Sequence, residues 1–194
     1  MNRIRESYGQ HKTTVIMVAM FIVSVVVRTA FAGYEKHILV IPDELLYYSY
    51  AQNLAWGNGF PVVYHGIYNY ENRFLYSILI APAFLMHNRV VQFVLIAMIN
   101  SIILTVGMIP TYLLAKELID GKWGFFCVAL YLTMPDMAYA ATFMPDILML
   151  SLGLWIIYVS YKLMDFGNLN SKQRIGYMAI LTLLIFAGVW TKKS

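Results

Sequence analysis

The stretch TTVIMVAMFIVSVVVRTAFAG, Thr13–Gly33, decides the class of this protein. A helix that crosses a hydrocarbon core of about 30 Å needs about 20 apolar residues, and this run supplies them. It is longer than the apolar part of a signal peptide and has no small-residue cleavage pattern. We therefore expect it to remain in the protein as a membrane helix. Arg28 lies near its end, and we expect that long side chain to reach the membrane surface.

The rest of the chain has the same character. Of 194 residues, 60% are hydrophobic and 12% are charged, about half the charged share of roughly 25% in soluble proteins. This composition excludes a soluble globular domain, a disordered chain and a disulfide-stapled secreted scaffold. Four more apolar runs are predicted to span the membrane: Val90–Ala115, Trp123–Ala141, Ile147–Met164 and Gly176–Trp190. The predicted fold is an all-α polytopic membrane protein of about five transmembrane helices, forming one membrane domain over residues 1–194.

One apolar run is too short to span. Phe74–Met86 contains Pro82, and its length suits a helix that lies in the membrane surface. It belongs to residues 34–89, a long segment between the first two predicted spans. A second helix is expected there after Pro42, ending near Gly57. Residues 34–89 are therefore predicted to be an external loop with interfacial helices.

Basic residues set the predicted orientation. With five spans, the N-terminus, Lys116–Lys122 and Lys162–Ile175 share one side and carry most of the Lys and Arg. The positive-inside rule places that side in the cytosol. The net charge of +4 is thereby explained by topology, and we expect no nucleic-acid partner.

Three acidic residues on the external side are the candidate catalytic groups. Asp43 and Glu44 follow Pro42, and Asp146 lies at the mouth of the fourth apolar helix. A carboxylate near hydrocarbon costs a few kcal/mol unless it is paired, hydrated or used. Carboxylates also complement the free N–H groups of a helix N-terminus, so capping is the competing interpretation at each position.

Candidate binding residues lie on the same side. Arg73 precedes the interfacial run at the depth of lipid phosphates, and Lys192 ends the last helix. Either could contact a phosphate, or Arg73 could serve only as a membrane-surface contact. Tyr47 and Tyr48 are candidate substrate contacts within a tyrosine-rich stretch, where an interfacial aromatic belt is the alternative. Two external carboxylates could position the acceptor or share a divalent metal. Asp43 with His37, His65 and His87 could also bind a metal, although their spacings match no known metal motif.

The order of these features resembles the N-terminal half of the GT-C class of membrane glycosyltransferases. Protein O-mannosyltransferases and lipid A aminoarabinose transferases have the most similar pattern. The resemblance covers nearly the whole chain and rests on the following residues in order: Arg28, Pro42-Asp43-Glu44, Ala81-Pro82-Ala83-Phe84, Tyr112–Leu118, Gly121–Gly124, Pro135, Asp146 and Thr191-Lys192.

The resemblance implies an activity and assigns roles. Such enzymes take a sugar from a polyprenyl-phosphate-linked donor on the non-cytosolic face, usually with inversion of the anomeric carbon. Asp43 matches the acid of the first external loop and is the candidate base, with Glu44 as the second choice. Asp146 matches the acid of the second external loop, and Lys192 matches a loop lysine loosely.

The chain also departs from that family, whose members usually have about twice as many spanning helices. We therefore expect a truncated chain that needs a partner subunit or a missing C-terminal half. The alternative function is a non-catalytic subunit for lipid-phosphate binding or assembly, or an inactive fragment of such an enzyme. A transporter is disfavoured because the acidic residues lie at helix ends on one side instead of mid-membrane.

Overall fold

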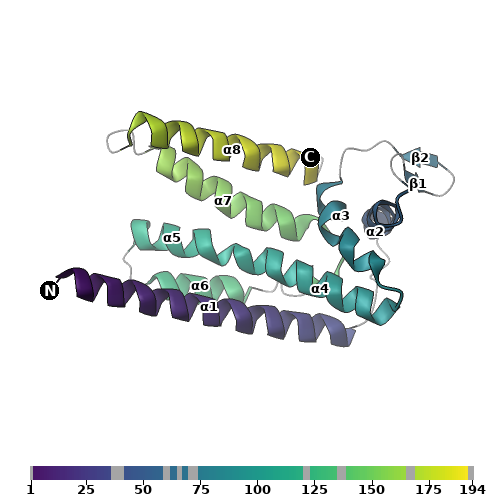
Figure 1. Ribbon diagram of the computed structural model, residues 1–194, viewed down its shortest axis with the longest axis horizontal. Coiled ribbons are helices and arrows are strands. Elements are labelled where there is room, and N and C mark those ends of the chain that lie inside the picture. The colour runs from purple at the N-terminus through teal and green to yellow at the C-terminus, as the bar shows by residue number, and fades with distance from the viewer. Residues whose placement is uncertain are drawn as a thin grey trace.

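A computed structural model of the chain describes residues 2–35, 42–58, 62–64, 67–69, 74–119, 123–134, 139–164 and 169–191, with the side chains of all of these except 2–10, 35, 42–43, 62–64 and 67–69 (Figure 1). The elements are α1 (Asn2–Glu35), α2 (Pro42–Ala55), β1 (Val62–Tyr64), β2 (Ile67–Asn69), α3 (Leu75–Ile80), the 3₁₀ helix η1 (Ala81–Leu85), α4 (Arg89–Val106), α5 (Met108–Leu118), α6 (Gly124–Leu132), α7 (Asp146–Met164) and α8 (Ser171–Thr191). The described structure is almost entirely helical. Its two short strands form one antiparallel hairpin, which the sequence did not predict.

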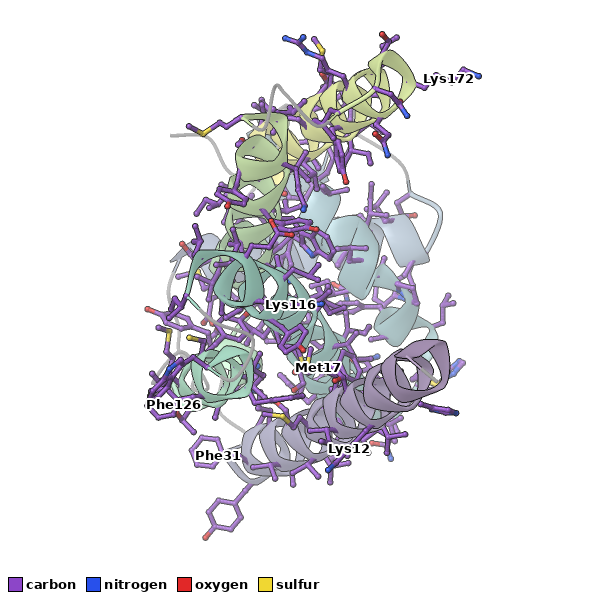
Figure 2. The ribbon with its side chains drawn as sticks, turned by 90° about the vertical axis from the view of Figure 1, so that its left-hand side faces the viewer. Lys12, Met17, Phe31, Lys116, Phe126 and Lys172 are labelled. Atoms are coloured by element: carbon purple, nitrogen blue, oxygen red, sulfur yellow. The ribbon has the colours of Figure 1, made fainter. Side chains whose placement is uncertain are left out.

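Within the described residues, four helices are long and apolar enough to cross a membrane: His11–Tyr34 in α1, Arg89–Leu118 in α4 and α5, α7, and α8. The protein is therefore an integral membrane protein with several spans. Apolar side chains cover the outside of these helices, as lipid contact requires; Phe31 and Phe126 point outward, whereas Met17 points between the helices (Figure 2).

The third predicted span, Trp123–Ala141, is wrong as a single helix. Its helical part, α6, has 9 residues, which at 1.5 Å per residue is about 14 Å, less than half of the hydrocarbon thickness. The Thr133 hydroxyl donates back to the carbonyls of Ala129 and Leu130 where the helix ends. Pro135, which cannot continue a helix, follows two residues later. The apolar composition of the run hid this break.

The elements alternate in direction. The N-terminal end of α1, the end of α5 and the start of α8 lie at one end of the bundle (Figure 1). The hairpin, α2, α3 and the starts of α4 and α7 lie at the other end, which we call the site end. The helix α6 begins at the end opposite the site end, and α7 begins at the site end. The chain therefore reaches the site end between Leu132, where α6 ends, and Asp146, where α7 begins. Which end faces the cytosol stays a prediction.

The predicted interfacial run is short in the structure as well. The helices α3 and η1 together cover Leu75–Leu85, and α2 and α3 cross the site end instead of running along the bundle (Figure 1). Both pack into one apolar core with α4 and the start of α7. Its members include Tyr47, Ala51, Tyr76, Ile80, Phe84, Phe143 and Ile147. This core connects the first external segment to the spanning helices.

Candidate functional site

Glu44 lies in the first turn of α2, where Pro42 and the acidic pair start the helix as expected. Its side chain is fully buried, and Oε1 accepts a hydrogen bond of 3.0 Å from the backbone N–H of Phe143. A buried carboxylate needs such donors, because burial of an unpaired charge is costly. Glu44 was expected to be available as a second candidate base. The structure instead gives it a contact that positions the segment before α7.

Tyr76 and Asn100 hold the same segment from the other side. The Tyr76 hydroxyl donates to Asn100 Oδ1 at 3.0 Å, and Asn100 Nδ2 donates to the carbonyls of Thr142 at 2.8 Å and Ala140 at 3.2 Å. Tyr76 and Asn100 are both fully buried. Burial raises the pKa of the Tyr76 phenol well above its ordinary value of 10.0; the hydrogen bond to Asn100 opposes this shift, and the nearby Glu44 adds to it. Tyr76 is therefore a neutral donor at physiological pH.

The two candidate tyrosines have different environments. Tyr47 is buried, its ring packs edge-on against Tyr76 at 5.8 Å, and its carbonyl accepts from the Ser77 hydroxyl. Tyr47 is therefore a core residue in this structure, and its contact with a substrate stays a prediction. Tyr48 is half-buried and packs edge-on against Phe84 and Phe143 at 4.8 and 5.5 Å. Tyr48 still faces a pocket.

That pocket has a mixed lining, in which polar and aromatic side chains lie beside Leu85 and Met86, and it is the more polar of the two cavities at this end. It has a volume of about 430 Å³ and lies between α2 and the turn from η1 into α4. Its lining includes Tyr48, Gln52, Trp56, His87, Arg89 and Gln92. The Trp56 side chain is 60% exposed, so its ring is available for contact. Aromatic faces combined with amides, an imidazole and a guanidinium suit a polar ligand with many hydroxyl groups.

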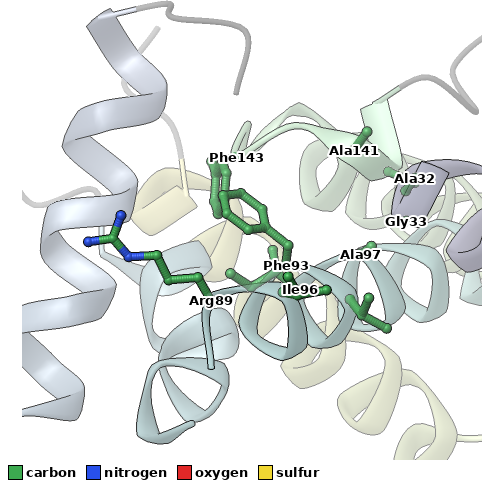
Figure 3. A pocket seen from close by; sticks show the side chains of 11 residues that line it. Ala32, Gly33, Arg89, Phe93, Ile96, Ala97, Ala141 and Phe143 are labelled. Carbon is green, nitrogen blue, oxygen red and sulfur yellow. The ribbon is translucent and has the colours of Figure 1, made fainter. Parts of the chain in front are cut away.

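A second cavity lies beside it and is apolar. It has a volume of about 220 Å³ and is lined by small side chains of α1, α4 and residues 140–141, with Phe93 and Phe143 at one side. Arg89 lines both cavities. In Figure 3, its guanidinium points away from the end of the cavity formed by Ala32, Gly33 and Ala97. The site end therefore contains an apolar cavity and a polar pocket that share one cation.

Arg89 was not among the residues selected from the sequence. It is the first residue of α4, and the Asn88 side chain caps that helix by accepting from the N–H groups of Val90 and Val91. A cation at a helix N-terminus is electrostatically unfavourable, since that end carries partial positive charge. No described residue forms an ion pair or hydrogen bond with the Arg89 side chain. Asn-Arg directly before an apolar run was the available signal.

Asp146 begins α7 and is half-exposed. It lines a separate cavity of about 220 Å³ with Leu104, Tyr139, Ile147 and Leu150. The structure does not bring Asp146 into the cavities that Arg89 lines. Within the described residues, no group of three His, Cys, Asp or Glu side chains is arranged to hold a metal ion.

The other site predictions lie outside the described residues: the side chain of Asp43, and Arg73 and Lys192 altogether. Asp43 is the second residue of α2, so its backbone lies at the site end. The described neighbours of Arg73 and Lys192 meet there too. The rings of Phe74 and Trp190 are in edge-on contact, with centroids 4.5 Å apart.

Known proteins add nothing to this description, because no family model, curated protein or solved structure matches the chain. The geometry of the site end is therefore the basis for inferring the function.

Proposed function

We propose that this protein binds a polyprenyl-phosphate-linked sugar and takes part in transfer of that sugar on the non-cytosolic face of the membrane. The observation that carries the proposal is Arg89, shared by an apolar cavity and a polar pocket. A lipid-linked sugar has the same order of parts: an apolar chain, a phosphate and a polyhydroxylated ring. The Arg guanidinium presents a fork of N–H donors that matches phosphate oxygens.

In the proposed reaction, an acceptor hydroxyl or amine attacks the anomeric carbon. The bond from that carbon to the phosphate oxygen breaks, and polyprenyl phosphate leaves with the bonding electrons. Asp43 is the candidate base that takes the acceptor proton. The leaving group is already a stabilised anion, so a cation beside it contributes more than a general acid would. Arg89 is our candidate for that cation, in addition to Arg73 and Lys192.

Two observations favour a second function. Glu44 is buried against Phe143, and Asp146 lines a different cavity. Two of the three candidate carboxylates are thus not placed beside Arg89. A non-catalytic subunit that binds a lipid phosphate would need Arg89 and both cavities but no base. Transfer activity distinguishes the two functions, whereas lipid-phosphate binding is common to both.

The first experiment measures binding of a polyprenyl phosphate to the chain in lipid nanodiscs. Arg89→Gln is expected to weaken binding at least tenfold. Lys116→Gln is the matched control, because it removes one exposed positive charge from α5 at the end opposite the site. Its affinity is expected to stay within twofold of wild type. Equal affinities for the two variants would reject Arg89 as the phosphate contact.

The second experiment measures sugar transfer from a polyprenyl-phosphate-linked donor, by the chain alone and with any partner that co-purifies. Asp43→Asn is expected to abolish transfer and leave lipid-phosphate binding unchanged. Transfer that survives this substitution would remove Asp43 as the base. Binding without transfer by the wild-type protein would favour the non-catalytic function.

A further inference from the structure

The helix α6 ends inside the apolar part of the bundle. It begins at Gly124, opposite the site end, and its 9 residues extend about 14 Å toward the site end. The last carbonyls of any helix lack partners within the helix. In hydrocarbon they must be satisfied by other protein groups, because water is absent. A helix that ends at Leu132 is therefore stable there only when other protein groups hydrogen-bond its last carbonyls.

Arg28 supplies one of those contacts. Its Nη2 donates to the Leu132 carbonyl at 3.2 Å, and its Nη1 donates to Thr105 Oγ1 at 3.4 Å. The Arg28 side chain is 3% exposed, so the expectation that it would reach the membrane surface is wrong. The C-terminal end of a helix carries partial negative charge, which attracts a guanidinium. The contact with Leu132 turns Arg28 inward.

Hydroxyl groups form hydrogen bonds between α1 and α4 near Arg28, and one of them, that of Thr105, contacts it. Ser24 and Thr105 are in hydrogen-bond contact at 3.2 Å, and the Thr29 hydroxyl donates to Ser101 at 3.4 Å. Such small polar contacts are common between membrane helices and contribute modestly to their association. Thr105 thus connects Arg28 to the packing of α1 against α4, whereas Leu132 connects it to the end of α6.

The chain after α6 is held by side chains from two other helices. Asn100 of α4 hydrogen-bonds the carbonyls of Ala140 and Thr142, and Glu44 of α2 accepts from the N–H of Phe143. Ala140 and Phe143 line the apolar cavity, and Thr142 lies next to Phe143 in the chain. Arg28 of α1 binds the backbone at Leu132, where α6 ends. Together with Asn100 and Glu44, buried side chains of three helices therefore hold the segment between α6 and α7 at both of its ends.

We propose that Arg28 is a positioning residue: its fixed positive charge at the C-terminal end of α6 stabilises the broken third crossing and thereby sets the place of residues 139–146. Those residues form part of the wall of the Arg89 cavity and lead into Asp146. Arg28 does not line that cavity, so its effect on ligand binding is indirect. The inference about the backbone is independent of ligand chemistry; its effect on lipid-phosphate binding rests on the proposed function.

The test uses a cysteine at position 140 as a reporter of the segment. Ala140 is 1% exposed, so Ala140→Cys, in a chain with Cys127→Ser, is expected to react slowly with a water-soluble maleimide in nanodiscs. Arg28→Gln is expected to raise that rate at least tenfold. Arg28→Lys keeps the charge and loses the fork of donors, so a rise of about threefold is expected.

Thr105→Val is the matched control. It removes the hydroxyl that contacts Arg28 and Ser24. The hydrogen bond from Arg28 to the Leu132 carbonyl does not involve this hydroxyl and can still form. Its labelling rate is expected to stay within twofold of wild type. An Arg28→Gln rate within twofold of wild type, or a Thr105→Val rate equal to that of Arg28→Gln, would overturn the proposal. If Arg28→Gln does not fold, Arg28→Lys decides: a rate equal to that of Thr105→Val rejects the role of Arg28.

Lipid-phosphate binding is measured on the same variants. We expect binding to weaken in Arg28→Gln and to be restored largely by Arg28→Lys, with both proteins folded by thermal unfolding. Absence of binding by the wild-type protein would reject the proposed function and leave the labelling result standing. Unchanged binding in an Arg28→Gln protein that labels rapidly would reject an effect of Arg28 on the ligand site and leave its role in placing residues 139–146 standing.

Discussion

The two ends of the helical bundle are stabilised by different kinds of polar contact. At the site end, Glu44, Tyr76 and Asn100 are fully buried and hydrogen-bond to one another or to the backbone of residues 140–143. At the opposite end, Lys162 of α7 forms an ion pair with Glu117 of α5, and both side chains are more than a quarter exposed.

This difference indicates where the chain needs one geometry. A buried polar group that loses its partner keeps the whole cost of its lost hydration, so a buried network permits few alternatives. An exposed ion pair can break and be hydrated with little loss. We infer that the site end is held in one arrangement, and the opposite end tolerates movement. Substitutions at the two ends test this inference, and their expected effects differ severalfold.

The largest effect is expected for Asn100→Leu. The substitution keeps the volume but removes the Asn100 donor to the carbonyls of Ala140 and Thr142 and the acceptor of the Tyr76 hydroxyl, which keeps only its 3.4 Å contact with the Thr142 carbonyl. We expect the free energy of unfolding in mixed micelles to fall by about 3 kcal/mol. Ser101→Ala is the neighbouring control, since Ser101 is equally buried, and its loss is expected to be about 1 kcal/mol. Equal losses of unfolding free energy for the two variants would mean that the Asn100 hydrogen bonds stabilise the fold no more than those of Ser101 do.

The next effect concerns Glu44. Glu44→Ala removes the acceptor of the Phe143 N–H, and we expect a loss of about 2 kcal/mol in the free energy of unfolding. Glu44→Gln retains a carbonyl oxygen that can accept the same hydrogen bond, so its loss is expected to stay below about 1 kcal/mol. Chemical denaturation of the two variants measures both values. A Gln variant as unstable as the Ala variant would show that the charge, not the hydrogen bond, is required.

The sequence predicted the parts of the fold that depend on apolar length. Thr13–Gly33 and Val90–Ala115 correspond to the spans in α1 and in α4 with α5, and Phe74–Met86 is short in the structure as expected. Trp123–Ala141 failed for a physical reason. Apolar composition measures the tendency to enter the membrane and does not show where a helix stops. The stop depends on Thr133 and on Arg28, which is distant in sequence.

The candidate site was predicted less well for the same reason. The start of α2 at Pro42 and the arrival of Glu44 and residues 139–146 at one end follow from chain order and span direction. Whether a side chain faces a cavity or the core depends on its partner. Glu44 faces the core because it hydrogen-bonds the Phe143 N–H, and Tyr47 faces the core because its ring packs against Tyr76. Arg89 became a candidate only because the structure places it in the lining of two cavities.

A smaller effect is expected for Tyr76→Phe, which removes one hydroxyl and keeps the ring. We expect a loss of about 1 kcal/mol near pH 7, because the Asn100 acceptor loses its donor. The pKa of Tyr76 is raised in the folded protein, so the wild-type phenol stabilises the fold fully below pH 10 and progressively less above it. The stability difference between wild type and variant should therefore shrink as the pH rises above about 10. A difference that grows with pH would contradict the burial of a neutral phenol.

The smallest effect is expected at the opposite end. Lys162→Met keeps the aliphatic length and removes the ion pair with Glu117 and the contact of the ammonium group with the Tyr158 ring at 5.9 Å. Because both charges are partly hydrated, we expect the free energy of unfolding to change by less than about 0.5 kcal/mol, and less at high salt. Glu117→Gln should change it equally little. A loss as large as that of Asn100→Leu would mean that both ends are held rigidly, and the contrast between them would disappear. A small loss would leave the buried network at the site end as the determinant of the fixed geometry.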